Sequence, residues 1–397
     1  MEPPIKICAL TTISKTMDWF IVDSMRNLAQ NGYEVTLICD MENGFADRNR
    51  DFATCINIPM SRGASLKDLL TVPFKLRKIF KKNKFDIIYY ATPNVSLYAS
   101  VGGFLAGIHT RVYNQWGLGY VSFGGIKRKI FKLVELITCK LSTVIRSASP
   151  MNMQFSIDEK LCSKEKISVV GIGGTIGVDL RECDSIDREE ARLEIRNKYD
   201  IPEDGFVFGY VGRINADKGV NELIEAFCEL QKKHDNIYLF LVGMMDNANP
   251  ISEDNMSVAQ KNSHIVFTGN VPSEQVLRYM AMFDVLTHPT YREGFGKVLQ
   301  EAMGMYLPIV TTDIPGPSEV VESGVSGILV EARNPNDLAD KMELMYTDAE
   351  LRERLAAEGR KRVEKYFDRP IMLNNILCDI NGIMGVETKE KVEETAV

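Results

Sequence analysis

The feature that most constrains this 397-residue chain is the alternation of short, wholly apolar runs with longer helical patterns. The runs EVTLICD (34–40), FDIIYYAT (85–92) and IYLFLVG (237–243) lack the regular polar alternation of a strand with one face in water. Apolar strands separated by helices are typical of a parallel sheet that is covered on both faces. The sequence therefore predicts an α/β protein built on parallel sheets.

This alternation runs through the chain twice, with a glycine-rich segment near 171–185 between the two passes. A chain of this length also exceeds the size at which one core usually keeps growing. We therefore predict two Rossmann-like, doubly wound domains that face a central cleft, where such sheets bind ligands. The predicted parts are an N-terminal domain (1–180), a C-terminal domain (181–368), a helix that crosses back to the N-terminal domain (369–385) and a tail (386–397).

Cysteine usage and the N-terminus indicate a cytoplasmic protein. The eight cysteines are scattered, without a C-x-x-C pair or a histidine at metal-ligand spacing, which is typical of a reduced compartment. MEPPIKICAL lacks the features of a signal peptide, and no stretch reaches the roughly 18 apolar residues that a membrane span needs. We expect neither a metal site nor a nucleic-acid partner.

The most informative segment is YREGFGKVLQE (291–301), which follows a predicted strand and a proline. Gly294 and Gly296 permit close approach to the backbone, and the N–H groups that open the next helix suit hydroxyls or phosphates. Glu293 in the loop and Glu301 two turns into the helix could hold a sugar and a ribose. Taken alone, the segment is more simply a capped loop with Glu301 on the surface.

A second pattern follows the strand predicted at 205–213. Arg213 and Lys218 lie five residues apart across a βα loop, next to a helix start. Two cations in this position can clamp a diphosphate, and the helix dipole adds to their effect. An exposed basic loop is an equally good interpretation of this pattern alone.

The two patterns occur in a fixed order with others: V-G-R-x4-K-G, then F-x-G, then H-P-T-x-R-E-G-F-G-x4-E-A, then P-I-V-T-T-D. In this order the chain resembles the retaining glycosyltransferases of family 4, which have the GT-B double-Rossmann fold. The resemblance covers nearly the whole length and is strongest between Tyr210 and Val330.

The resemblance implies roles for individual residues. Arg213 and Lys218 would neutralise the donor diphosphate, Glu293 would act catalytically beside the donor sugar, and Glu301 would bind the ribose. Further donor contacts would come from Gly294, Phe295 and Gly296 and from the segment 267–271, which resembles the loop that holds the base. His288 stands where relatives often have a small polar residue and could line the donor pocket. The sequence contains no D-x-D triplet, so we expect a metal-independent site without a cofactor, in which cations and helix dipoles stabilise the leaving diphosphate. By the same resemblance the reaction retains anomeric configuration through same-face attack.

The N-terminal half resembles the subset of the family that builds bacterial surface polysaccharides. The segment from Tyr113 to Tyr120 matches the Y-T-x-H-G-L-G-F signature of this subset, except that Trp116 replaces a histidine that commonly contacts the donor sugar. Stacking of Trp116 on a sugar and a contact from Asn114 or Gln115 both remain open. Thr12, at the end of the first strand, is a further candidate contact with the acceptor or sugar.

Charge is divided unevenly along the chain. Residues 1–170 carry 23 lysines and arginines against 14 aspartates and glutamates, or +9, and the rest carry 24 against 40, or −16. The predicted helix 126–141 combines basic and apolar residues and could lie on an anionic membrane, or it could be a core helix with a solvated basic face. The lipid-linked acceptors typical of the family favour peripheral contact at the inner face of the plasma membrane.

We therefore expect a hexosyltransferase that moves a sugar from a nucleotide-diphosphate sugar, a UDP-sugar in preference to a GDP-sugar, to a lipid-linked or glycan acceptor. The expected pathway is capsule, exopolysaccharide or O-antigen synthesis. Two alternatives share the fold: an enzyme like the UDP-N-acetylglucosamine 2-epimerases, and a nucleotide-sugar-binding protein with altered catalysis.

The basic helix 66–84 is expected to break before Pro73, because a residue that precedes proline disfavours helical geometry.

Overall fold

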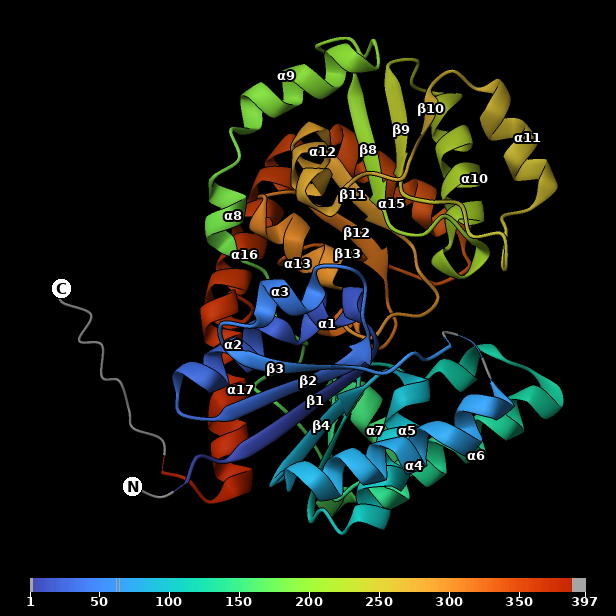
Figure 1. Ribbon diagram of the computed structural model, residues 1–397. Helices are drawn as coiled ribbons and strands as arrows, with labels where there is room; N and C mark the ends of the chain where they lie inside the picture. Colours follow the sequence, from blue (N-terminus) through green and yellow to red (C-terminus); the bar gives the residue numbers. More distant parts are fainter. Residues whose placement is uncertain (1–2, 62, 64, 388–397) are drawn as a thin grey trace. The chain divides into compact units, whose positions relative to one another are not determined.

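The computed structural model describes residues 3–61, 63 and 65–387. The chain forms two compact units that divide after Ile176 and again after Arg369, so that the C-terminal helix belongs to the first unit (Figure 1). The predicted boundaries at 180 and 368 lie close to these divisions. The part of the predicted tail from 388 onward lies outside the described residues.

The first unit is built on a seven-stranded parallel sheet in the order β3-β2-β1-β4-β5-β6-β7. Its strands are β1 (Lys6–Ile13), β2 (Glu34–Asp40), β3 (Ala53–Asn57), β4 (Ile87–Ala91), β5 (Thr110–Gln115), β6 (Val144–Ser147) and β7 (Ile167–Val169). Its helices are α1 (Ser14–Phe20), α2 (Val22–Gln30), α3 (Phe45–Asn49), α4 (Leu66–Asn83), α5 (Pro93–Ala106), α6 (Gly125–Leu141) and α7 (Pro150–Asp158). Sequence analysis missed β3, an edge strand whose residues are all partly or fully exposed and so lack the apolar run of its neighbours.

The second unit is built on a six-stranded parallel sheet in the order β10-β9-β8-β11-β12-β13. Its strands are β8 (Phe206–Val211), β9 (Ile237–Val242), β10 (Ile265–Gly269), β11 (Val285–His288), β12 (Ile309–Thr312) and β13 (Ile328–Val330). Its helices are α8 (Leu180–Asp184), α9 (Arg188–Lys198), α10 (Val220–Gln231), α11 (Glu253–Lys261), α12 (Val276–Met282), α13 (Lys297–Gly304), α14 (Pro317–Val320), α15 (Pro335–Thr347) and α16 (Ala349–Tyr366). Two parallel α/β sheets with helical connections confirm the predicted fold class.

The last helix, α17 (Arg369–Met384), is held in the first unit by polar contacts as well as by packing. Arg146 Nε donates to Asp379 Oδ2 at 2.8 Å, and Tyr33 Oη donates to Asn381 Oδ1 at 2.6 Å. Ile376 and Ile380 pack into the apolar cluster on one face of the first sheet. The C-terminus of the chain therefore completes the fold of its N-terminal part.

The predicted break before Pro73 is wrong, because α4 runs without interruption from Leu66 to Asn83. Proline inside a helix removes one hydrogen bond and usually costs about 3 kcal/mol. Here Pro73 is buried, and its carbonyl lies 2.9 Å from the position that a Cβ on Gly102 of α5 would occupy. Close packing of the two helices at this glycine offsets the local cost.

No helix among the described residues is long and apolar enough to cross a membrane.

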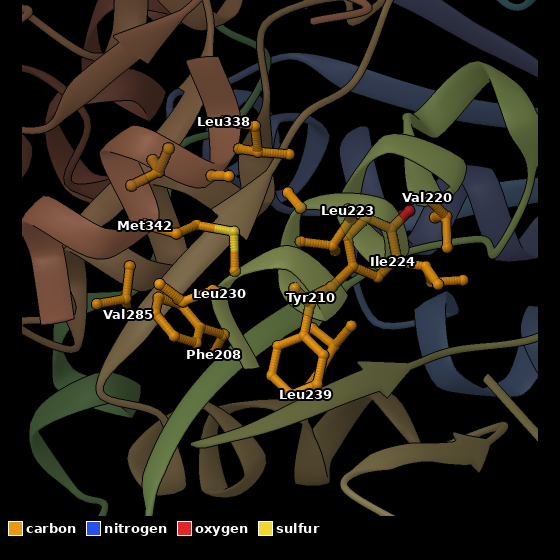
Figure 2. Close-up of a cluster of buried hydrophobic side chains, with 14 of the residues drawn as sticks. Phe208, Tyr210, Val220, Leu223, Ile224, Leu230, Leu239, Val285, Leu338 and Met342 are labelled. Atoms are coloured by element: carbon orange, nitrogen blue, oxygen red, sulfur yellow. The ribbon is translucent and has the colours of Figure 1, made fainter. Parts of the chain in front are cut away.

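The core of the second unit lies between its sheet and the helices α10 and α15, and Figure 2 shows its side chains. Phe208 and Tyr210 of β8 point into this cluster, where they lie among Leu223, Leu239 and Met342. Because side chains alternate along a strand, Gly209 faces the other side of the sheet. A Cβ built on Gly209 would lie only 2.0 Å from the ring of the buried Phe283.

We predict that Gly209→Ala destabilises the second unit by about 1–3 kcal/mol, because the added methyl group overpacks a closed interior. Thermal unfolding followed by circular dichroism should show this loss. The two tryptophans, Trp19 and Trp116, both lie in the first unit, so their fluorescence provides an internal control. An unchanged circular dichroism transition would contradict the close packing at Gly209.

Candidate functional site

The two sequence patterns meet at the end of the second sheet that is formed by the carboxyl ends of its strands. Strands β8 and β11 are neighbours, and the carboxyl ends of parallel strands lie on the same side. The Tyr291 N–H donates to the Asp217 carbonyl at 2.9 Å, which joins the loop after β11 to the loop after β8. Gly219 has φ +68°, and a Cβ there would lie 1.9 Å from the Pro289 carbonyl oxygen. Only glycine allows this close approach of the two loops.

Lys218 and Glu293 form the central contact of this edge. Lys218 Nζ lies 2.5 Å from Glu293 Oε2, and the two side chains are 16% and 23% exposed. The other carboxylate oxygen of Glu293 accepts a hydrogen bond from the Gly294 N–H at 3.2 Å. The resemblance assigned Lys218 to the donor diphosphate and Glu293 to the donor sugar, and the structure brings these two residues into direct contact.

His288 lies beneath this ion pair. Its ring stacks on Tyr210 with centroids 5.4 Å apart, and its Nε2 lies 3.6 Å from Glu293 Oε2, beyond hydrogen-bond length. Although the side chain is buried, neither ring nitrogen has a hydrogen-bond partner among the described residues. Burial lowers the pKa of His288 below its ordinary value and outweighs the attraction of the Glu293 carboxylate. The imidazole is therefore neutral at neutral pH.

Glu293 is ionised at neutral pH for the opposite reason. Burial raises the pKa of Glu293. The nearby His288 and Lys218 lower it by a larger amount than burial raises it, so that the net pKa lies well below the usual range. The site thus holds a buried carboxylate whose charge is balanced by one lysine. A ligand that drew Lys218 away would leave this carboxylate facing a neutral imidazole.

Arg213 lies at the same edge but has a different partner. Its Nη1 is 2.9 Å from Asp246 Oδ2, and its side chain is 66% exposed. Asn215 Nδ2 donates to the same Asp246 oxygen at 3.0 Å. Asp246 and Asn215 were not predicted from the sequence. The position of Asp246 just after the apolar strand β9 was the signal that could have identified it.

The remaining predicted donor residues lie on the loop that opens α13. Gly296 has φ +81° and begins the helix, while Phe295 is buried and packs edge-on against Phe367 at 5.5 Å. The Phe295 side chain therefore anchors the loop in the interior of the second unit. Glu301 forms an ion pair with Lys297 one helical turn earlier.

Close backbone packing also fixes the other side of this loop. Gly316, at φ +96°, begins α14, and a Cβ there would lie 2.9 Å from the Glu293 carbonyl oxygen and 3.0 Å from that of Gly294. A larger residue at this position would push the loop away from α14. The segment that follows β12 therefore supports the loop that carries the catalytic candidate.

In the first unit, Thr12 and Asn114 lie near the carboxyl ends of β1 and β5, the two strands that flank β4. Thr12 Oγ1 lies 2.7 Å from Thr92 Oγ1, and Asn114 Nδ2 donates to the Tyr90 carbonyl at 3.3 Å. Thr92 has φ +75°, which is unusual for a β-branched residue and marks this edge as locally strained.

Gln115 and Trp116, the two residues that follow Asn114, have different surroundings. Trp116 packs on Phe20 with ring centroids 5.2 Å apart. Gln115, the other alternative to Trp116, is buried, and its Nε2 donates to Glu135 Oε1 at 2.7 Å. Its amide oxygen accepts from Ser156 Oγ at 2.7 Å. Both ends of this amide are therefore used inside the fold.

Two family models match the chain. The model described as glycosyl transferases group 1 matches residues 191–362, and the model described as glycosyl transferase 4-like matches residues 6–149. Among curated proteins, the capsular polysaccharide biosynthesis glycosyltransferase CapM of Staphylococcus aureus is 30% identical over 369 residues, which cover 92% of this chain and 94% of CapM.

Solved structures share the whole architecture. Sucrose-phosphate synthase from Thermosynechococcus elongatus superposes with a TM-score of 0.78 at 17% identity and covers 96% of this chain and 99% of its own. Anabaena HepE, solved in complex with UDP and glucose, superposes with a TM-score of 0.77 at 17% identity over 95% of this chain and 100% of its own. These similarities confirm the predicted GT-B class of fold.

We predict that Lys218→Met destabilises the second unit by about 1–3 kcal/mol at neutral pH, because it leaves a largely buried carboxylate without its cation. Since folding lowers the pKa of Glu293, the ion pair stabilises the protein fully above the ordinary carboxyl pKa of 4.5, and this stabilisation is lost progressively as the pH falls from 4.5 to the lowered pKa of the folded state. Urea unfolding followed by circular dichroism at several pH values should therefore show the variant converging on the wild type in acid.

Lys297→Met is the matched control for this experiment. It removes a more exposed partner one helical turn from Glu301 and should cost no more than about 0.5 kcal/mol. A stability loss in Lys218→Met that stays constant across the pH range would contradict the account, because it would arise from lost packing rather than from the charge of Glu293.

Proposed function

The chain belongs to the group 1 glycosyltransferases, and we propose that it transfers a hexose from a nucleotide-diphosphate sugar, in the first place a UDP-sugar, to a lipid-linked or glycan acceptor. The product would be a capsular polysaccharide, an exopolysaccharide or an O-antigen. The observation that carries this proposal is the contact between Lys218 and Glu293 at the carboxyl ends of neighbouring strands. CapM, whose name assigns it to capsule synthesis, supports the choice of pathway.

The donor diphosphate would bind Lys218 and Arg213. Both cations have carboxylate partners, Glu293 and Asp246, so the diphosphate exchanges one anionic partner for another at each of them. Arg213 can turn readily because it is largely exposed. Backbone N–H groups of the loop from Gly294 to Gly296 would bind sugar hydroxyls, and Glu301 would accept from the ribose. HepE, which shares the fold, binds UDP and glucose, and this supports UDP as the first donor to test.

The proposed reaction retains configuration at the anomeric carbon. The bond from this carbon to the diphosphate oxygen breaks, and its electron pair stays on the leaving diphosphate. The acceptor hydroxyl attacks from the same face and gives its proton to the leaving phosphate oxygen, so the products are a glycoside and a nucleoside diphosphate. Ionised Glu293 stabilises the positive charge that develops on the sugar, and Lys218 with Arg213 stabilises the leaving group. These residues supply the charge stabilisation without a metal ion.

The acceptor would be bound by the first unit. Thr12, Asn114 and Trp116 lie at the carboxyl ends of β1 and β5 or just beyond them, which is where sheets of this type bind ligands. Trp116 is partly exposed and presents a ring that can stack on a sugar face. The proposed location is the cytoplasm at the inner face of the plasma membrane, where a lipid-linked acceptor would be reached through the helix 126–141.

Two other functions use the same fold. A UDP-N-acetylglucosamine 2-epimerase would convert its nucleotide sugar without any acceptor, and a binding protein would hold it unchanged. The ionised pair of Glu293 and Lys218 favours transfer over a decayed site, because an unused buried charge pair costs more than an apolar replacement. Product analysis with and without acceptor distinguishes the three functions.

We predict that Glu293→Gln lowers the transfer rate at least about 100-fold, the range found when one stabilising group is removed from an active site. The same change should leave UDP binding intact or tighten it, because Lys218 no longer has to leave a carboxylate. Calorimetric titration with UDP and a transfer assay over a panel of UDP-sugars and GDP-sugars would measure the two effects.

Glu353→Gln is the matched control, since Glu353 is exposed on α16 of the same unit and should change neither quantity. Failure of the wild type to bind either UDP or GDP would contradict the donor site. Unchanged turnover in Glu293→Gln would remove this residue from the mechanism while leaving the donor site in place.

A further inference from the structure

Helix α6 is apolar on the side that faces solvent. Ile126, Ile130, Leu133 and Ile137 follow one another at spacings of four, three and four residues, which places them in one stripe along the helix. Their side chains are 77%, 56%, 56% and 37% exposed. The buried residues Glu135, Thr138 and Cys139 lie on the opposite side of the same helix. The exposed stripe is therefore no part of the core.

The basic residues of α6 divide into two groups. At 100° per residue, Lys127, Lys129 and Lys140 lie on either side of the apolar stripe, and all three are exposed. Arg128 and Lys132 lie on the side of the helix away from the stripe, where Lys132 forms an ion pair with Glu159 at 2.5 Å and Arg128, although exposed, lies over the ring of Tyr120. The sequence left open a membrane-facing helix or a core helix with a solvated basic face. In the structure three exposed lysines border the apolar stripe, and one of them, Lys127, also lies over the ring of Phe123.

Helix α4 shows the same combination. Leu66, Leu70 and Phe74 recur every four residues and are 80%, 69% and 57% exposed, while Leu76 and Phe80 are buried. Together α4 and α6 contain eleven lysines and arginines against two acidic residues. One of these acids, Glu135, is buried, and the other, Asp68, accepts a hydrogen bond from the Ser61 N–H.

The two helices cover the same face of the first sheet (Figure 1). Both pack against α5, and residues of all three helices share one apolar cluster. At the end of α5, Phe104 adds a ring that is 56% exposed. We call this face the α4–α6 surface. Its apolar residues are Leu66, Leu70, Phe74, Phe104, Ile126, Ile130, Leu133 and Ile137.

We propose that the α4–α6 surface docks the enzyme on an anionic lipid bilayer. Apolar stripes bordered by lysines match such a surface, because lysine stems can lie along the apolar region while the ammonium groups reach the headgroups. A second copy of the chain does not match, since it would bring the same excess of positive charge against itself. The proposal deepens the proposed function, because it identifies where the enzyme meets a membrane that carries a lipid-linked acceptor.

Sedimentation with vesicles tests this proposal. The wild type should bind vesicles of equal parts phosphatidylglycerol and phosphatidylcholine but not vesicles of phosphatidylcholine alone. Lys127→Glu with Lys129→Glu should lower the binding at least tenfold at low salt, and Ile126→Ser with Ile130→Ser should lower it at low and high salt alike. Lys15→Glu with Arg50→Glu makes the same charge change at exposed residues of α1 and the end of α3, on the opposite face of the sheet, and should have little effect.

Titration with UDP distinguishes failure of this proposal from failure of the donor site, because all these variants should bind UDP as the wild type does. Absence of vesicle binding by the wild type would overturn the docking proposal and leave the donor site standing. An equal loss in the control variant would also overturn it, since net charge rather than this surface would then be responsible. Dimers that the Ile126→Ser, Ile130→Ser variant abolishes would identify the surface as an interface between copies instead.

Discussion

Parallel pairing of β8 with β11 is the constraint on which the arrangement of the candidate donor site depends. It places the carboxyl ends of two strands that are far apart in sequence side by side, so that the loops carrying Lys218 and Glu293 start from the same edge. Glycine then decides how closely these loops approach. At Gly219 a side chain would collide with the Pro289 carbonyl, and at Gly316 it would collide with the backbone around Glu293. The fold and the site thus share one set of backbone contacts.

The resulting arrangement places two cations, Lys218 and Arg213, next to carboxylate partners. The Glu293 carboxylate, whose pKa is lowered, faces Lys218 and the neutral, buried His288. The exposed Arg213 forms an ion pair with Asp246. Partnered charges are less costly to bury than isolated ones, so the fold tolerates a site that is strongly charged. A diphosphate would take over both cations and leave Glu293 free to face the sugar. The donor would therefore activate the group that is proposed to stabilise the reaction.

The sequence predicted the fold class well, because apolar strand runs and glycine-terminated helices are local signals that the parallel sheets preserve. It also predicted that Lys218 and Glu293 belong to one site, but not that they form an ion pair, because partner choice depends on distances that no spacing encodes. The pairing of Arg213 with Asp246 was missed for the same reason. The error at Pro73 arose because packing on Gly102 outweighs a local preference. Helix α6 was recognised, yet which of its lysines face solvent became clear only from the direction of its buried side.

The central claim is that Lys218 exchanges the Glu293 carboxylate for a diphosphate. A crystal structure of the protein with UDP bound tests it most directly. The account predicts that a phosphate oxygen lies within hydrogen-bond distance of Lys218 Nζ, with Arg213 turned toward the diphosphate and the Lys218–Glu293 contact lengthened. UDP bound at another edge of the second sheet, or bound here with the ion pair intact, would contradict it.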